Sequence, residues 1–467
     1  MRIGLVNVNV RSDGPEKLVG YLPPLPLLCI GGALIDAGFT DISLIDATTD
    51  NFSAEETCEV ILQNNFEIVF LSAMASTAST FSVKKISKLL KERKFDIKIV
   101  VGGVHATFCF EEFMEEGNID YLCRGEGEQF SIELMQALEN DNNLHGIKGL
   151  VWNDNGNIIV NNSRKQLIDL NNFRVAWELI DQWDKYKIPM TGEKAAVIQF
   201  SRGCPNRCNF CGQWEFWKKW RYKDIVSFVN EMEFLKHDHD ISYFFFADEN
   251  PQTVQTVWVE LFKEILKRDL GIHMILNLRV TDVIRDRRYF KLFRDAGLVT
   301  VDLGVESAIQ DRLDLMNKST TIEQNSSAIE ILRDNGVISI IQTLVGYPDE
   351  SVESLEITFE RLKKWDPDLL HFYHVTPFPW TKYGKSLNSA IIKEKNYSKW
   401  DYRHQILKLN NIEEEELYKK IHTFTFNYNF NSNNFTKILL KKDKYIRDTL
   451  INALFIVMKN RSEKIAR

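Results

Sequence analysis

Residues 199–214, QFSRGCPNRCNFCGQW, decide how the second half of the chain is interpreted. Cys204, Cys208 and Cys211 follow the apolar run 195–200, with three and then two residues between successive cysteines. Three thiolates on one tight loop after a strand can hold three irons of a cubane cluster and leave the fourth iron open. The stretch therefore predicts an iron–sulfur loop at the first strand of an α/β domain.

A structural zinc site is the main alternative at these cysteines. Zinc needs a fourth ligand, but no Cys-x-x-Cys pair follows, and the nearest histidines, His237 and His239, belong to a different expected element. A coincidence of buried cysteines is the other alternative.

Downstream of the loop, apolar strand candidates alternate with amphipathic helical periods. The strand candidates are residues 241–250, 273–280, 300–307, 338–348 and 369–379. Together with residues 195–200 they make about six βα units, fewer than the eight of a closed barrel. Residues 196–385 are therefore expected to form a partial TIM-type barrel.

Upstream, residues 1–140 show the same alternation, which predicts a parallel sheet covered on both faces, a doubly wound Rossmann-like domain. Segments at the expected carboxyl ends of the strands, where such domains bind ligands, are rich in Gly, Ser, Thr and Asn: 7–20, 72–80, 102–107 and 124–128. Residues 141–195 are expected to form a hairpin, turning at 154–156, and a linker. Residues 386–467 are expected to be a small helical region, interrupted by a loop at the Asn-rich stretch 427–434.

Composition excludes several classes of protein. The 467 residues are 44% hydrophobic and 26% charged, which excludes a disordered chain, collagen and a coiled coil. The net charge of −7 without a basic block argues against nucleic-acid binding and favours a small-molecule partner. The N-terminal run lacks a signal-peptide pattern and no eighteen apolar residues run uninterrupted, so we expect a cytoplasmic protein with no membrane span. Seven cysteines, three of them clustered, indicate thiolate chemistry in a reducing compartment.

The three-cysteine spacing resembles the signature of the radical S-adenosylmethionine (SAM) superfamily. The resemblance implies that the methionine group of SAM chelates the open iron, and that one electron from the four-iron four-sulfur cluster cleaves the sulfonium to a 5′-deoxyadenosyl radical. Residues 346–350 are similar to the family's fifth-strand motif. The SAM-binding positions that the resemblance implies are Phe210, Glu249, Arg279, Glu306 and Ser307. Taken singly, a Glu at a strand end is more often a solvated carboxylate or a helix cap.

Residues 20–47, 100–107 and 120–128 resemble the cobalamin-binding domain that precedes the radical domain in one large subclass. The cobalamin-site candidates that this implies are Ser72, Met74, Gly102, Gly103, His105, Thr107, Glu126 and Gly127. The cobalt-ligating pattern Asp-x-His-x-x-Gly is absent around His105, so we expect no histidine on the lower cobalt face. A flavodoxin-like module that binds a nucleotide, or nothing, is the alternative for this domain.

Residues 211–224, 376–384 and 399–409 resemble the anaerobic magnesium-protoporphyrin IX monomethyl ester oxidative cyclase group, up to about residue 408. The resemblance implies hydrogen abstraction from an unactivated carbon beside a tetrapyrrole ring, with cobalamin in the oxidation and water as the oxygen source. We also expect an electron donor such as flavodoxin or ferredoxin. The region after His404 is shorter than we expect for the cyclases, which leaves the substrate open.

An aromatic and basic run directly follows the last cysteine. Its members are Trp214, Phe216, Trp217 and Trp220, with Lys218, Lys219 and Arg221. Such side chains suit a flat, apolar substrate that carries a carboxylate. A helix whose aromatic side packs on the barrel or on the neighbouring domain is an equal alternative.

No catalytic residue is assigned from the sequence. His371, His374 and His404 are candidates for an acid, a base or a metal ligand, although each alone is more often structural. Tyr373 is expected to face away from both His371 and His374.

Two other functions remain open. A cobalamin-dependent radical SAM carbon methyltransferase shares every motif quoted above. A non-catalytic cobalamin or redox sensor, in which the first domain reports to the barrel, is the third hypothesis.

Overall fold

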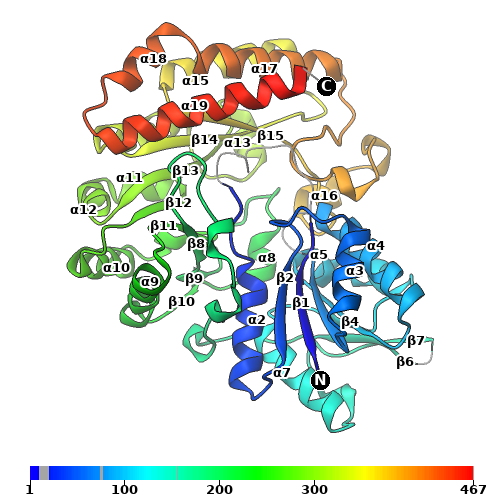
Figure 1. The fold of residues 1–467 in the computed structure, drawn as a ribbon. Helices are drawn as coiled ribbons and strands as arrows, with labels where there is room; N and C mark the ends of the chain where they lie inside the picture. The colour runs from blue at the N-terminus through cyan, green and yellow to red at the C-terminus, as the bar shows by residue number, and fades with distance from the viewer. Residues whose placement is uncertain (10–19, 74–76, 155, 466–467) are drawn as a thin grey trace.

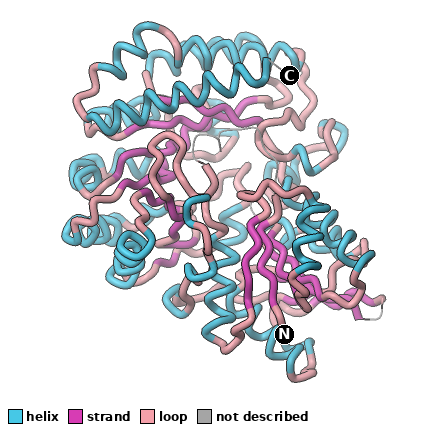
Figure 2. The backbone as a smooth tube through the Cα atoms, in the orientation of Figure 1, coloured by secondary structure: helices cyan, strands magenta, loops and turns pink. Residues whose placement is uncertain are grey.

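The computed structural model describes residues 1–9, 20–73, 77–154 and 156–465 and places them in two α/β units that lie side by side (Figure 1). Figure 2 shows the strands of the two units as separate groups, each accompanied by helices.

The N-terminal unit is built on a seven-stranded sheet with the order β2-β1-β3-β4-β5-β6-β7. The strands are β1 (Ile3–Asn7), β2 (Ile42–Asp46), β3 (Ile68–Ser72), β4 (Lys98–Gly102), β5 (Tyr121–Cys123), β6 (Leu150–Asp154) and β7 (Asn157–Val160). The first five pair in parallel. Its helices are α2 (Leu25–Asp36), α3 (Ala54–Gln63), α4 (Ala78–Arg93), α5 (Val104–Phe108), α6 (Phe110–Met114) and α7 (Glu128–Glu139), with the 3₁₀ turn η1 (Leu144–Gly146).

Both faces of this sheet are buried. Successive residues of each strand point to opposite faces, so each strand contributes side chains to two cores. In β3, Val69 and Leu71 pack with α3 and α4, whereas Ile68 and Phe70 pack with α2 and α7. The prediction of a doubly wound domain is confirmed.

The predicted hairpin forms, but it extends the N-terminal sheet and is no part of a linker. β6 pairs antiparallel with β5, and β7 with β6. The hairpin joins the sheet because this buries the apolar side chains of β6. Leu150, Val151 and Trp152 fill both faces at the end of the sheet. Asn155, at the predicted turn, lies outside the described residues. The connection that follows carries only the short turns η2 (Leu170–Asn172), η3 (Trp177–Leu179) and η4 (Trp183–Lys185).

The second unit is a six-stranded sheet with the order β15-β14-β13-β12-β11-β8, parallel throughout. Its strands are β8 (Ala195–Ile198), β11 (Tyr243–Phe246), β12 (His273–Arg279), β13 (Leu298–Glu306), β14 (Ile338–Val345) and β15 (Leu369–His374). The prediction of a partial six-unit barrel is confirmed, because strands that follow one another along the chain are neighbours in the sheet.

Helices cover the outside of this sheet (Figure 1). They are α9 (Ile225–His239), α10 (Gln255–Arg268), α11 (Val280–Arg285), α12 (Phe290–Asp295), α13 (Gln310–Leu315), α14 (Ile322–Asp334) and α15 (Val352–Trp365), with the turns η5 (Pro251–Thr253) and η6 (Arg287–Tyr289). A short ribbon of β9 (Ser201–Arg202) and β10 (Arg221–Tyr222), with α8 (Gln213–Trp217) between the two strands, follows β8.

The C-terminal region is helical, as predicted, and packs on the barrel. Its elements are α16 (Lys382–Ser386), η7 (Ser389–Ile391), η8 (Tyr397–Lys399), α17 (Glu414–Asn429), α18 (Ser432–Leu439) and α19 (Lys444–Ile465). Phe424 of α17 stacks on Phe359 of α15, and Leu450 of α19 packs against Ile338 at the start of β14. Within the described ranges, no helix is long and apolar enough to span a membrane.

The Asn-rich stretch 427–434 is not the predicted loop. α17 continues to Asn429 and α18 starts at Ser432. Asn431 is the N-cap of α18 and its side chain accepts a hydrogen bond from the backbone N of Asn434. Asparagines therefore end one helix and start the next here, since their side chains satisfy free backbone groups at helix ends.

Candidate functional site

We call residues 201–212 the cluster loop; it follows β8 and is held by the end of β11. The buried Asp248 carboxylate accepts hydrogen bonds from the backbone N of Phe200 at 3.1 Å and from both the backbone N and the hydroxyl of Ser201 at 2.5 Å. Burial raises the pKa of Asp248 to about 7, against the lowering effect of these donors. Asp248 thereby sets the course of the chain into the cysteines.

Gly203 admits a turn that other residues would not. Its φ is +102°, and a Cβ here would lie 2.4 Å from the backbone O of Lys219. Its backbone N donates to the Glu249 carboxylate at 3.1 Å. Burial raises the pKa of Glu249 to about 8. The SAM candidate Glu249 is therefore in direct contact with the cluster loop.

The three cysteines lie together on this loop, with Cys208 buried and Cys204 and Cys211 half-buried. The sulfur atoms of the three cysteines do not all lie within 4.8 Å of one another, whereas the ligand atoms of a single zinc ion would. Burial raises the pKa of Cys211 to about 12, so this thiolate needs a compensating positive charge, which irons would supply. The donor set therefore fits a multi-iron cluster better than a single ion.

Arg279, at the end of β12, adds the donor group expected beside such a cluster. Its Nη1 lies 3.4 Å from the Cys208 sulfur and its Nη2 donates to the backbone O of Lys318 at 2.7 Å. Its buried Nε has no hydrogen-bond partner among the described residues. An orphaned guanidinium N–H beside the Cys208 thiol fits an anionic group, such as the carboxylate of SAM.

Glu306 and Ser307 end β13, as expected, but both already have protein partners. Glu306, at φ +65°, forms a buried ion pair with Lys318 at 2.6 Å. The Ser307 hydroxyl accepts from the backbone N of Ile309 at 3.0 Å. Phe210, the adenine candidate, packs beside a small apolar cluster.

The cobalamin candidates lie at the carboxyl ends of β3, β4 and β5. Thr107 connects two of these ends, because its hydroxyl donates to the backbone O of Gly103 at 2.8 Å and accepts from the backbone N of Gly125 at 3.0 Å. Gly103 has φ +117° at the start of α5, a conformation that favours glycine. The other candidates along this edge are Ser72, Gly102 and Gly127. Met74 lies outside the described residues.

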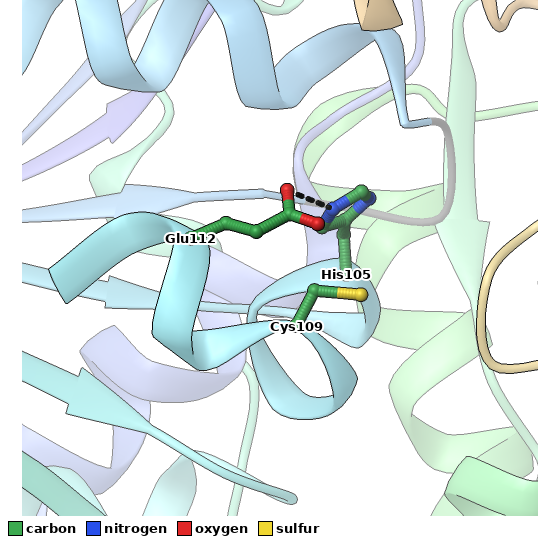
Figure 3. Close-up of side chains that lie close together, drawn as sticks. All are labelled: His105, Cys109 and Glu112. Atoms are coloured by element: carbon green, nitrogen blue, oxygen red, sulfur yellow. Dashed lines mark ion pairs between the residues drawn. The ribbon is translucent and has the colours of Figure 1, made fainter. Parts of the chain in front are cut away.

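The cobalamin candidate His105 is enclosed by protein contacts. Its side chain is fully buried, with Nδ1 3.2 Å from the Thr77 hydroxyl and Nε2 3.7 Å from the Glu112 carboxylate. Figure 3 shows the Glu112 carboxylate directed at the ring, with Cys109 beside it. Tyr397 donates from its hydroxyl to Glu112 at 3.1 Å, so this group attaches the N-terminal unit to the C-terminal region. His105 is therefore held by protein contacts, and its role in the cobalamin site stays a prediction.

Glu126, predicted to line the corrin tail, is paired with two arginines of the second unit. Both of its carboxylate oxygens accept hydrogen bonds from Arg221, and one also accepts from Arg202. The side chain is 3% exposed. Glu126 therefore points into the boundary between the two units.

The aromatic run after Cys211 largely packs on protein. Trp217 lies under the Arg202 guanidinium at 5.2 Å, and Phe216 packs beside a cluster that contains Trp380. Trp220 stacks on Tyr222 with centroids 5.0 Å apart. These contacts favour the packing alternative for Phe216, Trp217 and Trp220.

The three histidines differ in environment. His374 is buried, Nδ1 lies 2.8 Å from Gln405 Oε1, and burial lowers its pKa to about 4. His404 is exposed and contacts Asp401 at 3.0 Å. His371 is half-buried on β15 and its ring contacts that of Tyr373, with centroids 6.1 Å apart. The expectation for Tyr373 is wrong for His371, because residues two apart on a strand share a face.

Sequence reasoning missed several residues that shape the site. Lys318 neutralises Glu306, and Trp380 lies against Gly212, where a Cβ would come within 2.0 Å of its Nε1. Asp248 stands in the strand candidate 241–250, yet only the fold shows that it holds the cluster loop. A buried acid directly after an apolar strand was the available signal.

Comparison with known proteins agrees with these two units. The radical SAM superfamily matches residues 198–362, and the B12 binding domain matches residues 16–134. The chain is 33% identical to an anaerobic magnesium-protoporphyrin IX monomethyl ester cyclase of Rubrivivax gelatinosus over 99% of this chain and 83% of the relative. It is 28% identical to an uncharacterized methyltransferase of Pyrococcus horikoshii over 86% of this chain and 87% of the relative.

A solved structure has the same fold. It is the radical SAM methyltransferase TsrM from Kitasatospora setae with cobalamin and a [4Fe-4S] cluster bound, with a TM-score of 0.71 at 16% identity and coverage of 100% of both chains.

Proposed function

The chain belongs to the B12-binding enzymes of the radical SAM superfamily, and from that membership we propose that it oxidises a C–H bond of a flat, largely apolar small molecule in a cyclase-like reaction. The observation that carries this proposal is the 33% identity to a magnesium-protoporphyrin IX monomethyl ester cyclase over 99% of the chain. A tetrapyrrole is accordingly the substrate class to test first.

The cofactors are a [4Fe-4S] cluster, SAM and cobalamin. When bound, they supply the electron that cleaves SAM, the radical that takes hydrogen from the substrate, and a second redox centre. We propose that Cys204, Cys208 and Cys211 hold the cluster. The residues that we propose for SAM are Phe210, Glu249, Arg279, Glu306 and Ser307, and those for cobalamin are Ser72, Gly102, Gly103, Thr107 and Gly127.

Polar side chains on the inner side of the barrel support a substrate site near the residues proposed for the cofactors. Half-buried polar side chains of adjacent strands lie at its centre: Asn277 on β12, Asp302 on β13, Gln342 on β14 and His371 on β15. Burial raises the pKa of Asp302 to about 7, where a carboxyl group can hold or release a proton near neutral pH.

Carbon methylation is the second candidate. The similarity to an uncharacterized methyltransferase over 86% of this chain favours it. The two reactions differ in the atoms that reach the product.

A single anaerobic experiment separates the candidates. The holoenzyme receives reductant, SAM with a deuterated methyl group, H₂¹⁸O and magnesium-protoporphyrin IX monomethyl ester, and products are identified by mass spectrometry. Formation of 5′-deoxyadenosine with ¹⁸O in the product, or loss of hydrogen without methyl gain, supports the cyclase-like reaction. A deuteromethylated product with S-adenosylhomocysteine supports methylation instead, and the formation of neither 5′-deoxyadenosine nor a methylated product would refute both.

The matched controls are Cys208→Ala, which removes a proposed cluster ligand, and Cys58→Ala, which removes a buried cysteine of α3. The first variant should form no 5′-deoxyadenosine, whereas the second should form it.

A further inference from the structure

We propose that Glu126, Glu128, Arg202 and Arg221 form a buried charged contact, the domain clamp, that sets where the cobalamin-binding edge lies relative to the cluster loop. The four are positioning residues. The inference rests on the family's cofactors and is independent of which reaction the enzyme performs.

The domain clamp is a continuous set of ion pairs between the two units. Glu126 Oε1 accepts from Nη1 of Arg202 and Nη1 of Arg221, each at 3.0 Å, and its Oε2 accepts from Arg221 at 2.9 Å. Nη2 of Arg202 donates to Glu128 at 2.6 Å. Leu167, in the connection between the units, donates its backbone N to Glu126 at 2.8 Å and accepts from Arg221 at 2.6 Å.

All four side chains are nearly removed from water. Their exposed fractions are 3% for Glu126, 6% for Glu128, 11% for Arg202 and 10% for Arg221. Burial acts to raise the pKa of Glu128, but the nearby arginines hold it below its ordinary value. Two carboxylates and two guanidinium groups balance each other, and each charge removed would leave another buried without a partner.

Each end of the domain clamp lies directly beside a proposed cofactor site. Glu126 lies in the turn between β5 and α7, which also contains the cobalamin candidate Gly127, and Glu128 is the first residue of α7. Arg202 is two residues before Cys204, and it pairs across the β9–β10 ribbon with Arg221. The Arg202 side chain therefore joins the turn at the cobalamin edge to the peptide that carries Cys204, the first cysteine.

Apolar packing, together with separate polar contacts such as the Tyr397–Glu112 hydrogen bond, also joins the two units. Leu25 and Leu28 of α2 pack with Ile198 and Phe200 of the barrel in one core. Such contacts are non-directional, whereas paired guanidinium and carboxylate groups have a fixed planar geometry. Two cofactors that act on one substrate need a constant separation, because small displacements reduce the rate of reaction steeply.

The test compares Glu126→Gln with Glu133→Gln, a matched control on α7. Glu133 pairs with Arg164 of the connection, away from the cluster loop. Both variants keep the side-chain shape and remove one charge. The readout is the magnetic interaction between cob(II)alamin and the reduced cluster, measured by pulsed electron paramagnetic resonance on the full chain with both cofactors, without substrate.

Wild type and Glu133→Gln should show the same narrow distribution of cobalt-to-cluster distances. Glu126→Gln should keep its cobalt and iron content and lose this narrow distribution, and Glu128→Gln should show a smaller broadening in the same direction. An unchanged distribution in Glu126→Gln would overturn the proposal.

A loss of cobalt from both Glu126→Gln and Glu128→Gln, with the cluster intact, would also overturn it, since these residues would then hold the corrin itself. If only Glu126→Gln fails to fold, Glu128→Gln decides. Because no turnover is measured, failure here is distinct from failure of the proposed reaction.

Discussion

Replacing His374 by Asn should reduce the loss of stability that the protein suffers at mildly acidic pH. His374 is 4% exposed, and burial lowers its pKa from 6.5 to about 4. An Asn side chain can donate to Gln405, as Nδ1 of the imidazole does, but it does not titrate in this range.

The size of the effect follows from the difference in pKa between the unfolded and folded states. The unfolded chain binds the proton more readily, so the contribution of a neutral His374 is complete above pH 6.5 and is lost as the pH falls from 6.5 towards 4. A pKa difference of this size corresponds to about 3 kcal/mol in total. Between pH 7 and pH 5 the loss is about 2 kcal/mol.

The assay is urea unfolding of the full chain at pH 7 and pH 5, followed by tryptophan fluorescence. We compare wild type and His374→Asn by how far the free energy of unfolding falls between pH 7 and pH 5. The contributions of all other titrating groups cancel when one fall is subtracted from the other. His237→Asn is the control, since His237 is exposed on α9. An equal fall in wild type and His374→Asn would show that the pKa of His374 is the same in the folded and unfolded states, and would restore it as a candidate acid.

Three further outcomes are expected. Cys208→Ala should unfold at nearly the same temperature as Cys58→Ala but bind fewer than four irons, because two thiolates do not hold the cubane; four irons per chain in this variant would refute the assignment of the loop. His105→Ala should leave the visible spectrum of bound cobalamin unchanged while lowering the melting temperature through loss of a buried side chain, and a shifted spectrum would mean that the imidazole reaches the cobalt. Gly212→Ala should cost about 1–3 kcal/mol of stability, measured by urea unfolding, because its Cβ would collide with the enclosed Trp380; unchanged stability would show that the tryptophan can move aside.

Much of the fold follows from local pattern. Alternating apolar runs and helical periods determine two parallel sheets, since a strand buried on both faces needs a continuous apolar run and a helix on each side. The same reasoning failed at residues 427–434, where capping by Asn431 lets two helices follow each other almost directly. The hairpin itself was predicted, but its attachment to the N-terminal sheet was not, because antiparallel addition of β6 to β5 depends on a free sheet edge that no local pattern reveals.

The cluster chemistry proposed for the cysteines follows from the sequence alone, because the three proposed ligands come from eight consecutive residues and their spacing is a local property. The surroundings of these ligands were decided by tertiary structure. Glu126 meets Arg202 across 76 residues and Glu306 meets Lys318 after a full helix, so neither pairing has a local signal. A buried charge takes whichever opposite charge the packing of the elements brings to it, and that packing exists only in the folded chain.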